Sequence, residues 1–397
     1  MAVVTVRDES KRQGDFYVPR FEIKIAGANL PQNVLRDVLQ LTYSDDVEKL
    51  DSFELTVNNW DAQKHEFKYC GSETTDSLTK NPLHQLFNPS RHEVEVYLGY
   101  GARLSLMMKG NFTTMEPNFP SSGGPTLSVR GLNVLDALRR EPFSQSWSRK
   151  TPSQIAKSFE KLPKERFPLP VEIDSNAMKD EREIEYIAQT SQCDINFLLV
   201  LAGRVGYVIF VKEEEREKGR IVQERRLYFG PSDANQPRLR PVTFELKWGV
   251  SLIDFKPTLT TATQVKNVTV SGWNRATKQP ITGKASLDDP KFKLNRDLRK
   301  QLENSDAREA QVVDEPVFTQ AQATERAEAI MRDRSKAQLK ASGTCIGLPE
   351  LRAGQRVKIA GLGERFSGEY FVTDTTHTIG ESGYITRFNA RREDPGK

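Results

Sequence analysis

The sequence contains few of the residues on which catalytic and metal sites usually depend. Its 397 residues include three cysteines (Cys70, Cys193 and Cys345) and four histidines. The cysteines lie far apart, and no CxxC motif or Cys/His spacing typical of a zinc site is present. We therefore expect reduced cysteines without a disulfide framework, no metal site and no cofactor.

Long hydrophobic runs are also missing. The longest apolar run, about residues 197–203, is far shorter than the roughly 20 residues that a membrane-spanning helix needs. The N-terminal residues MAVVTVRDESKRQG lack the apolar stretch of roughly 7–15 residues found in a secretory signal. We expect a protein made in the bacterial cytoplasm without a signal peptide and without stable insertion into a membrane.

Charge of one sign does not dominate. The 58 Lys and Arg residues against 54 Asp and Glu residues give a formal net charge of +4. Nucleic-acid-binding proteins tend to gather basic residues on one face, whereas the densest charged run, residues 212–220, mixes both signs. This pattern indicates a solvated loop and no sequence-specific recognition of nucleic acid.

Alternating apolar and polar residues predict β-strands in the first third of the chain. Phe21, Ile23 and Ile25 alternate with Glu22 and Lys24, which is the period of a half-buried strand. The same period recurs at residues 52–57, 94–98, 104–108 and 126–130. Glycine-containing turns separate these segments. We predict a β domain over residues 1–145.

Residues 146–240 carry helix signals between strands. Thr151-Pro152-Ser153-Gln154 is a capping box with proline at the first helical position. Residues 180–183 are expected to open a second helix, and a third, over 194–204, ends before Gly206, a residue suited to a helix C-terminus. Strands are expected at 207–211 and 226–229. These elements predict a small α/β domain.

The last part of the chain, residues 241–397, returns to β signals. Strands are expected near residues 243–246, 264–270, 356–359, 370–373 and 384–389. A polar stretch at about 288–315 and one helix interrupt them, and the helix opens at Thr319 and carries Ala323, Ala327 and Met331 on one face. The predicted fold class is mainly β with α+β parts. Two similar tube-like antiparallel β-barrels flank the small α/β domain, with a helical insertion at about 275–345 in the second barrel.

Two distant segments resemble each other. Leu55-Thr-Val-Asn-Asn-Trp-Asp61 is similar to Val268-Thr-Val-Ser-Gly-Trp-Asn274, and each is followed by a strand and a Gly-x-Gly turn, at 99–101 and 361–363. A duplicated barrel would explain the similarity, and chance resemblance between β-rich segments is the alternative. The duplication places Trp60 and Trp273 at equivalent barrel ends, where they pack instead of binding ligands.

No catalytic constellation emerges. His377 lies near Asp374 in the sequence, but no serine or cysteine has the context of a nucleophile elbow. The glycines around residue 361 precede a predicted strand, where a dinucleotide site needs a helix. The acidic pair Asp45-Asp46 is interpreted as loop acids. We predict no catalytic residue and no enzyme.

Two groups of residues carry a resemblance to a known family. In the middle domain they are Gln189, Asp194, Phe197, Leu198, Leu201, Ala202 and Gly206. Near the end they are an Ala-rich helix at 321–329, Gly347-Leu-Pro349, Leu351-Arg-Ala-Gly354 and the segment 383–388. With these residues the chain, from about 15 to 393, resembles the phage late-control-D proteins, the central hubs of contractile tails, and the hub half of VgrG-type spike proteins.

The resemblance implies a function in assembly. It implies a homotrimer in which each chain donates two barrels, so that three chains adapt a sixfold tail tube to a threefold spike. The implied partners are the tail tube protein, a separate spike protein and other baseplate proteins, within a virion tail or injection particle. Since the chain stops soon after the last hub strand, Arg391 and Arg392 are expected to face the spike.

Two features leave alternatives open. The polar segment 69–90 either contacts a neighbouring baseplate protein or is solvated. The alternatives to a hub are a tail-associated peptidoglycan hydrolase and a β-rich receptor- or carbohydrate-binding adhesin.

Overall fold

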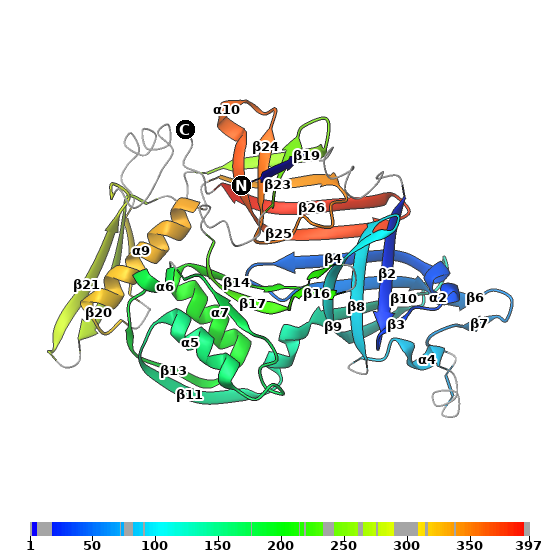
Figure 1. The fold of residues 1–397 in the computed structure, drawn as a ribbon, viewed down its shortest axis with the longest axis horizontal. Helices are drawn as coiled ribbons and strands as arrows, with labels where there is room; N and C mark the ends of the chain where they lie inside the picture. Colours follow the sequence, from blue (N-terminus) through cyan, green and yellow to red (C-terminus); the bar gives the residue numbers. More distant parts are fainter. Residues whose placement is uncertain are drawn as a thin grey trace.

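The computed structural model describes residues 2–5, 18–71, 73–74, 82–89, 92–175, 177–213, 215–217, 220–232, 242–260, 265–274, 277–289, 309–313, 317–336 and 339–392. Most of this backbone is β-strand, and a large sheet of mainly antiparallel strands crosses the molecule (Figure 1). The prediction of a mainly β fold with α+β parts is confirmed.

The first β unit comprises residues 19–133 of this sheet. Its strands are β2 (Pro19–Ile25), β3 (Ala28–Asn29), β4 (Val38–Asp46), β5 (Ser52–Asn58), β8 (Glu93–Tyr100), β9 (Arg103–Asn118) and β10 (Thr126–Asn133). They are neighbours in the order β4-β5-β10-β9-β8-β2-β3. Their inward side chains, such as Leu41, Leu55 and Val129, form one fully buried cluster, as period-2 alternation requires.

The second β unit repeats this order. Its strands are β18 (Val242–Lys247), β19 (Leu252–Leu259), β23 (Leu339–Ile346), β24 (Arg356–Ala360), β25 (Gly368–Gly380) and β26 (Gly383–Arg392). The sequence of neighbours β19-β23-β26-β25-β24-β18 matches β4-β5-β10-β9-β8-β2 strand for strand. One direction differs, because β18 runs parallel to β24 whereas β2 runs antiparallel to β8. The N-terminal β1 (Ala2–Thr5) adds to β18 in parallel.

Both units contain the same irregularity in the first strand of the matched order, β4 in one unit and β19 in the other. Between β4 and β5 the register shifts around Leu39, and between β19 and β23 it shifts around Ile253. Each of these residues is a β-bulge, the extra residue in its strand. Both side chains are exposed, Leu39 by 42% and Ile253 by 59%.

A second shared bulge lies in the long bent strand of each unit. Thr113 is the extra residue of β9 opposite β10, and Thr373 is the extra residue of β25 opposite β26. The Thr113 hydroxyl donates to the Arg130 carbonyl (3.4 Å) and the Thr373 hydroxyl to the Asn389 carbonyl (3.1 Å). Arg130 and Asn389 are themselves at matching places, each opposite the residue after the bulge. The two β units therefore share their strand order and the positions of both bulges, apart from the direction of β18.

The tryptophan segments do not correspond to each other. Trp60 begins β6 (Trp60–Asp61), which pairs with β7 (Glu66–Phe67). Trp273 lies in β20 (Asn267–Asn274), which pairs with β21 (Gln279–Ser286) and β22 (Glu309–Val312) in a separate sheet. The predicted equivalence of these segments is wrong, because the partner of β5 in the repeat is β23. The Gly-x-Gly turns do connect equivalent strands, β8 to β9 and β24 to β25.

The sheet of β20–β22 forms the insertion with helix α9 (Gln320–Lys336), between β19 and β23 (Figure 1). The insertion therefore begins before residue 275, the predicted start, because β20 belongs to it. The backbone N–H of Gln322 donates to the Thr319 hydroxyl (3.2 Å), as the predicted helix start requires. Ala323 meets Gly283 of β21 so closely that a Cβ on the glycine would lie 2.0 Å from the alanine carbonyl carbon. Residues 290–308 of the predicted polar stretch lie outside the described residues.

The middle of the chain combines short sheets with helices. Its strands are β11 (Pro142–Lys150), β12 (Val171–Ile173), β13 (Ile184–Cys193), β14 (Tyr207–Lys212), β15 (Glu215–Glu217), β16 (Arg220–Gln223) and β17 (Arg226–Pro231). Its helices are α5 (Pro152–Ser158), α6 (Ala177–Asp180) and α7 (Asp194–Val205), with short 3-10 turns at Val134–Arg139 and Phe159–Lys161. In the first unit, α2 (Gln32–Asp37) and α4 (Leu83–Leu86) are short, as is α10 (Gly363–Phe366) in the second.

Predictions for this middle part have mixed outcomes. The capping box is confirmed, since the Thr151 and Gln154 side chains each accept from the other's backbone N–H. The helix end at Gly206 is confirmed by its left-handed φ of 70°. The helix predicted from Asp180 is wrong, because that segment forms strand β13 paired with β11. The charged run predicted as a loop contains the β15–β16 hairpin.

Candidate functional site

The two β units are joined edge to edge by β4 and β25. These strands pair antiparallel from Asp46 opposite Asp374 to Leu41 opposite Ile379. Strand β25 can do this because it is long: its first residues pair with β24 and the rest extend beyond it. An unbroken antiparallel sheet of eight strands results, in the order β19-β23-β26-β25-β4-β5-β10-β9.

A buried ion pair lies beneath this joint. Arg352, in the connection between β23 and β24, donates from Nε to Asp45 Oδ2 at 2.6 Å. It also donates to the Met107 carbonyl (2.8 Å) and to the Tyr43 hydroxyl, and its guanidinium lies over the Tyr43 ring. Asp45 is 3% exposed and Arg352 8%. The pair joins the two units, because Asp45 belongs to the first and Arg352 to the second. Removing either partner would leave a buried charge without its counter-charge, which is strongly destabilising.

The same carboxylate leads into a network around His377. Asp45 accepts from the Thr375 hydroxyl and from the backbone N–H of Ala353 (3.2 Å). His377 Nε2 lies 3.0 Å from the Leu351 carbonyl, and since a carbonyl only accepts, Nε2 carries the proton. Burial lowers the pKa of His377 to about 3, so the ring is neutral.

The other side of the His377 ring is also hydrogen-bonded. Nδ1 lies 2.9 Å from the Tyr384 hydroxyl and 3.1 Å from the Thr386 hydroxyl. Asp374, which the sequence places near His377, instead accepts from Asn389 (2.8 Å) on the outer face and shares the Thr373 hydroxyl proton with the Asn389 carbonyl. The structure therefore does not bring Asp374 and His377 together, and His377 is a packed structural residue.

Two further carboxyl groups lie near Arg352. Burial, followed by the charge of Asp45, raises the pKa of Asp51 to about 8. Burial raises the pKa of Glu213 to about 7, although Arg225 and Arg352 act against it. The Asp51 side chain is 3% exposed. At neutral pH the joint therefore combines one ion pair with Asp51, which is mostly protonated, and Glu213, whose pKa lies close to that pH.

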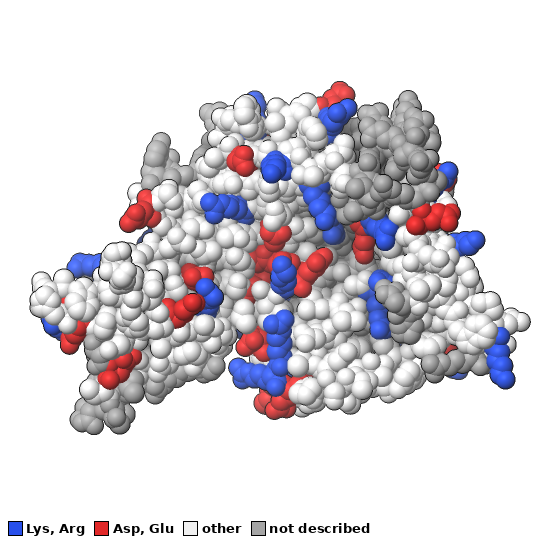
Figure 2. Space-filling view, turned by 180° about the vertical axis from the view of Figure 1, so that it is seen from behind, with Lys and Arg blue, Asp and Glu red and all other residues white. Residues whose placement is uncertain are grey.

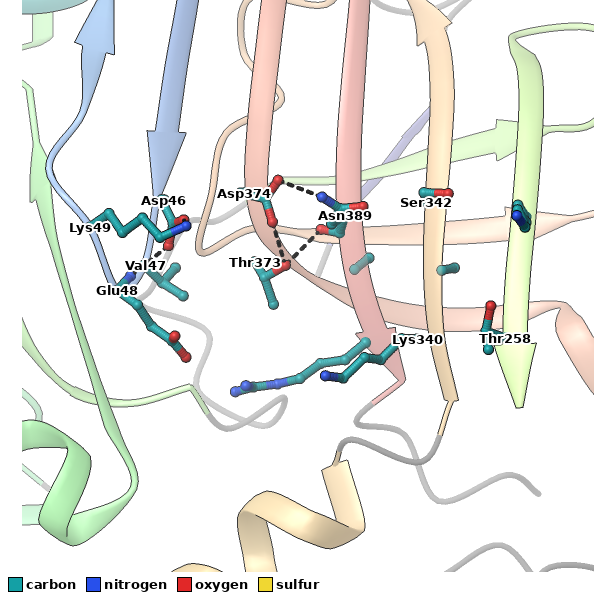
Figure 3. Close-up of a pocket in the computed structure, with 14 residues that line it drawn as sticks. Asp46, Val47, Glu48, Lys49, Thr258, Lys340, Ser342, Thr373, Asp374 and Asn389 are labelled. Atoms are coloured by element: carbon teal, nitrogen blue, oxygen red, sulfur yellow. Dashed lines mark hydrogen bonds and ion pairs between the residues drawn. The ribbon is translucent and has the colours of Figure 1, made fainter. Parts of the chain in front are cut away.

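A groove of about 540 Å³ opens on the outer face beside the joint (Figure 3). Asp46, Glu48 and Lys49, where β4 ends, form one side, and the facing strands β19, β23 and β26 supply the other. Lys256 and Lys340 project from those strands. On the face shown in Figure 2, basic and acidic side chains are mixed. The groove is a polar surface with charges of both signs.

Arg391 and Arg392, the predicted spike-facing residues, lie at the end of β26. Arg391 lines the groove, lies over the Phe371 ring and donates to the Ser232 hydroxyl (2.9 Å). Arg392 donates to the Arg365 carbonyl (2.8 Å). Both side chains thus contact the chain itself, and their role toward a spike stays a prediction.

The segment predicted as a polar insert is anchored at its start. Asn59 donates to the Cys70 carbonyl (2.8 Å) and accepts from the Tyr69 N–H (2.9 Å). Tyr69, Cys70 and Phe87 belong to the core of the first β unit, while residues 75–81 lie outside the described part. Trp60 packs edge-on against Phe67, with ring centroids 5.3 Å apart, and Trp273 is 54% exposed.

The residues that carried the family resemblance also have structural roles. Gln189 donates to Asp194 (2.7 Å), and Asp194 accepts two hydrogen bonds from Arg166 (2.7 and 2.8 Å). Within the described ranges, no group of three or more His, Cys, Asp or Glu side chains could hold a metal ion. No described helix is both long and apolar enough to cross a bilayer.

Comparison with known proteins identifies a family. The sequence profile of the Alg8 N-terminal domain matches residues 16–381. The chain belongs to the Alg8 N-terminal domain family. No curated protein sequence matches the chain. The family found is not the late-control-D family that the motifs indicated, so that finer assignment stays a prediction.

Solved structures share the fold of this Alg8 N-terminal domain. The 43 kDa tail protein of prophage MuSo2 from Shewanella oneidensis has a TM-score of 0.62 at 14% identity, covering 96% of this chain and 100% of that one. A tail protein from Neisseria meningitidis MC58 has a TM-score of 0.63 at 14% identity, covering 96% and 98%. An E. coli component of the type VI secretion system, described as similar to the T4 tail proteins gp27 and gp5, has a TM-score of 0.53 at 14% identity, covering 93% and 76%.

Proposed function

We propose that the chain is a structural part of a contractile tail or a related injection machine. Its place is the central hub, where a homotrimer adapts the sixfold tail tube to the threefold spike. The observation that carries this proposal is the duplicated β unit, with the same strand order and the same two bulges in both copies. The shared fold of phage tail proteins and a type VI component supports the same setting.

Symmetry explains why a duplication suits a hub. Closed assemblies repeat one interface per symmetry copy, so six tube subunits cannot all bind a threefold body in the same way. Three chains with two equivalent β units each would present six similar surfaces to the tube. The same three chains would keep threefold symmetry toward the spike.

The joint between the units supports a mechanical role without chemistry. A hub must transmit thrust without bending between its halves. Here the β4–β25 ladder is reinforced by the Arg352–Asp45 pair, which ties β4 to the connection before β24. The titratable groups at this joint are used in packing, and we propose that the protein is not an enzyme.

The proposed partners are the tail tube protein, a separate spike protein and neighbouring baseplate proteins. The tube would contact the duplicated units, because only they occur six times in a trimer. Arg391 and Arg392, at the end of β26, are proposed to lie toward the spike.

The oligomeric state tests the proposal. Light scattering and native mass spectrometry of the full chain, alone and with its spike, should give three copies per particle. A stable dimer, or a chain that stays monomeric with the spike present, would refute the hub. Clearing of peptidoglycan in a cell-wall assay would favour a hydrolase, and binding on a glycan array would favour an adhesin.

A further inference from the structure

The eight-strand sheet ends in two open edges, on β19 and on the last part of β9. Strand β8 follows β9 only as far as Glu93 opposite Asn111, so among the residues that the structure describes, those after the Thr113 bulge pair with β10 alone. Strand β19 pairs with β23 on one side, and apart from a single bridge at Leu252 no partner is found on the other within the described residues. An unpaired edge offers a row of backbone donors and acceptors to another strand.

The bulges align these two edges with the strands of the internal joint. Counting from Leu39 and Ile253, Ser44 of β4 corresponds to Thr258 of β19. Counting from Thr113 and Thr373, Glu116 of β9 corresponds to Thr376 of β25. Each open edge is thus the repeat equivalent of a strand that is already paired inside the chain.

We propose that β9 of one copy pairs antiparallel with β19 of a second copy, repeating between chains the joint that β25 and β4 form within one. Inside the chain Thr376 lies opposite Ser44, with the two hydroxyl oxygens 3.2 Å apart. The equivalent register places Glu116 opposite Thr258 of the second copy. The contact is head to tail, so it closes into a ring when the number of copies fits the curvature.

The side chains brought together in this register are compatible. Met115, which is half-buried, would contact Leu259, which is 40% exposed. Both side chains would then bury apolar surface that is now exposed to water. Asn118 lies opposite Lys256, and Glu116 lies diagonal to it, within reach of an ion pair between cross-strand neighbours. The same positions inside the chain hold Thr375 and Asp45 where the new contact has Met115 and Leu259.

A proline on each edge fits the same register. Pro117 lies on β9 and Pro257 on β19, and each removes one backbone donor. In the equivalent rung of the internal joint, His377 lies opposite Tyr43. The two prolines therefore fall opposite each other, which confines the lost hydrogen bonds to one rung. Edge prolines also discourage pairing with unrelated strands.

Engineered disulfides test the register directly. This inference rests on the proposed ring of hubs, so the oligomer is measured first by native mass spectrometry of the full chain. Glu116→Cys combined with Thr258→Cys should then give, after mild oxidation, covalent species of up to three chains on a non-reducing gel. Thr376→Cys with Ser44→Cys is the matched control, because it should give a disulfide within a single chain.

Each outcome is informative. The single variants Glu116→Cys and Thr258→Cys should stop at one chain, as should Glu116→Cys with Leu259→Cys, whose side chains point to opposite faces. An oligomer that forms without the Glu116–Thr258 cross-link overturns this joint and leaves the hub intact. The absence of any oligomer, alone or with the spike, removes the hub and the joint together.

A second pair of variants keeps the test independent of cysteine chemistry. Leu259→Asp places a charge in the proposed contact and should raise the concentration needed for assembly at least tenfold. Leu39→Asp is the control, since Leu39 is equally exposed, at 42% against 40%, but lies away from the open edges. Equal effects of the two substitutions on assembly would count against the joint.

Discussion

Thr113 and Thr373 occupy the same bulge in the two halves of the chain. Each hydroxyl donates to a backbone carbonyl of the adjacent strand, that of Arg130 in the first half and that of Asn389 in the second. A bulge of this kind increases the local twist and bends the strand. In both β units the bend lets one strand take part in two differently oriented parts of the sheet. In β25 the part beyond the bend carries the joint to β4.

The buried ion pair at that joint should dominate its stability. Replacing Arg352 by Met leaves Asp45 charged and buried, and should lower the free energy of unfolding by roughly 3–5 kcal/mol. Urea unfolding followed by circular dichroism measures this. Lys49→Met is the control, because Lys49 pairs with Asp46 at the surface, 79% exposed, where such pairs contribute at most about 1 kcal/mol. Equal losses in the two variants would contradict the assigned role.

Asp51 should make the protein less stable in mild base. The pKa of Asp51 is about 8 in the folded protein and about 4 in the unfolded chain. The contribution of the neutral carboxyl to the free energy of unfolding is therefore complete below about pH 4 and is lost as the pH rises to about 8. The slope is at most about 1.4 kcal/mol per pH unit, and Glu213 adds to it up to about pH 7. Between pH 7 and 8, Asp51→Asn should flatten the decline measured by urea unfolding. Asp254→Asn, at an exposed position, should leave it as in the parent chain.

His377 should act in the opposite direction on the acid side. The pKa of His377 falls to about 3 in the folded protein. The contribution of the neutral ring to the free energy of unfolding is therefore complete above about pH 6.5 and is lost as the pH falls toward 3. Relative to His377→Gln, the parent chain should lose about 1.4 kcal/mol per pH unit in this range. Unfolding curves at pH 6.5, 5.5 and 4.5 would show it. A constant difference between the two proteins would mean that the ring is not held neutral.

The capping box of α5 offers a local prediction. Thr151→Ala removes the side chain that accepts from the Gln154 N–H and should cost roughly 0.5–2 kcal/mol. Thr151→Ser keeps the hydroxyl and should restore most of the loss. Hydrogen exchange at the first turn of α5 reports the effect locally, and unchanged exchange in the alanine variant would argue against the cap.

The sequence predicted those elements whose signals are local. Thr151 and Gly206 mark helix ends by their own chemistry, and the alternation around Ile23 marks β2. Strand β13 was missed because one of its inward-facing residues is polar. Gln189 is buried there and donates a hydrogen bond to Asp194, so the strand lacks the apolar alternation by which the sequence predicts the other strands.

Long-range features could not be predicted in the same way. Asp45 looked like a loop acid because its partner Arg352 is 307 residues away. The true repeat between the β units lies in strand order and bulge positions, and the residues at matched positions vary. Thr113 matches Thr373, but Glu116 matches Thr376. The similar Trp60 and Trp273 segments belong to different sheets, so short sequence similarity pointed to the wrong pair.

One strand breaks the likeness of the two halves: β18 lies parallel to β24, with β1 added beside it, whereas β2 runs antiparallel to β8. This difference lies away from the eight-strand sheet. In a ring of three chains, a partner that binds the eight-strand sheets would meet six nearly identical sites. A partner that contacts β2 or β18 would instead distinguish the first β unit of each chain from the second.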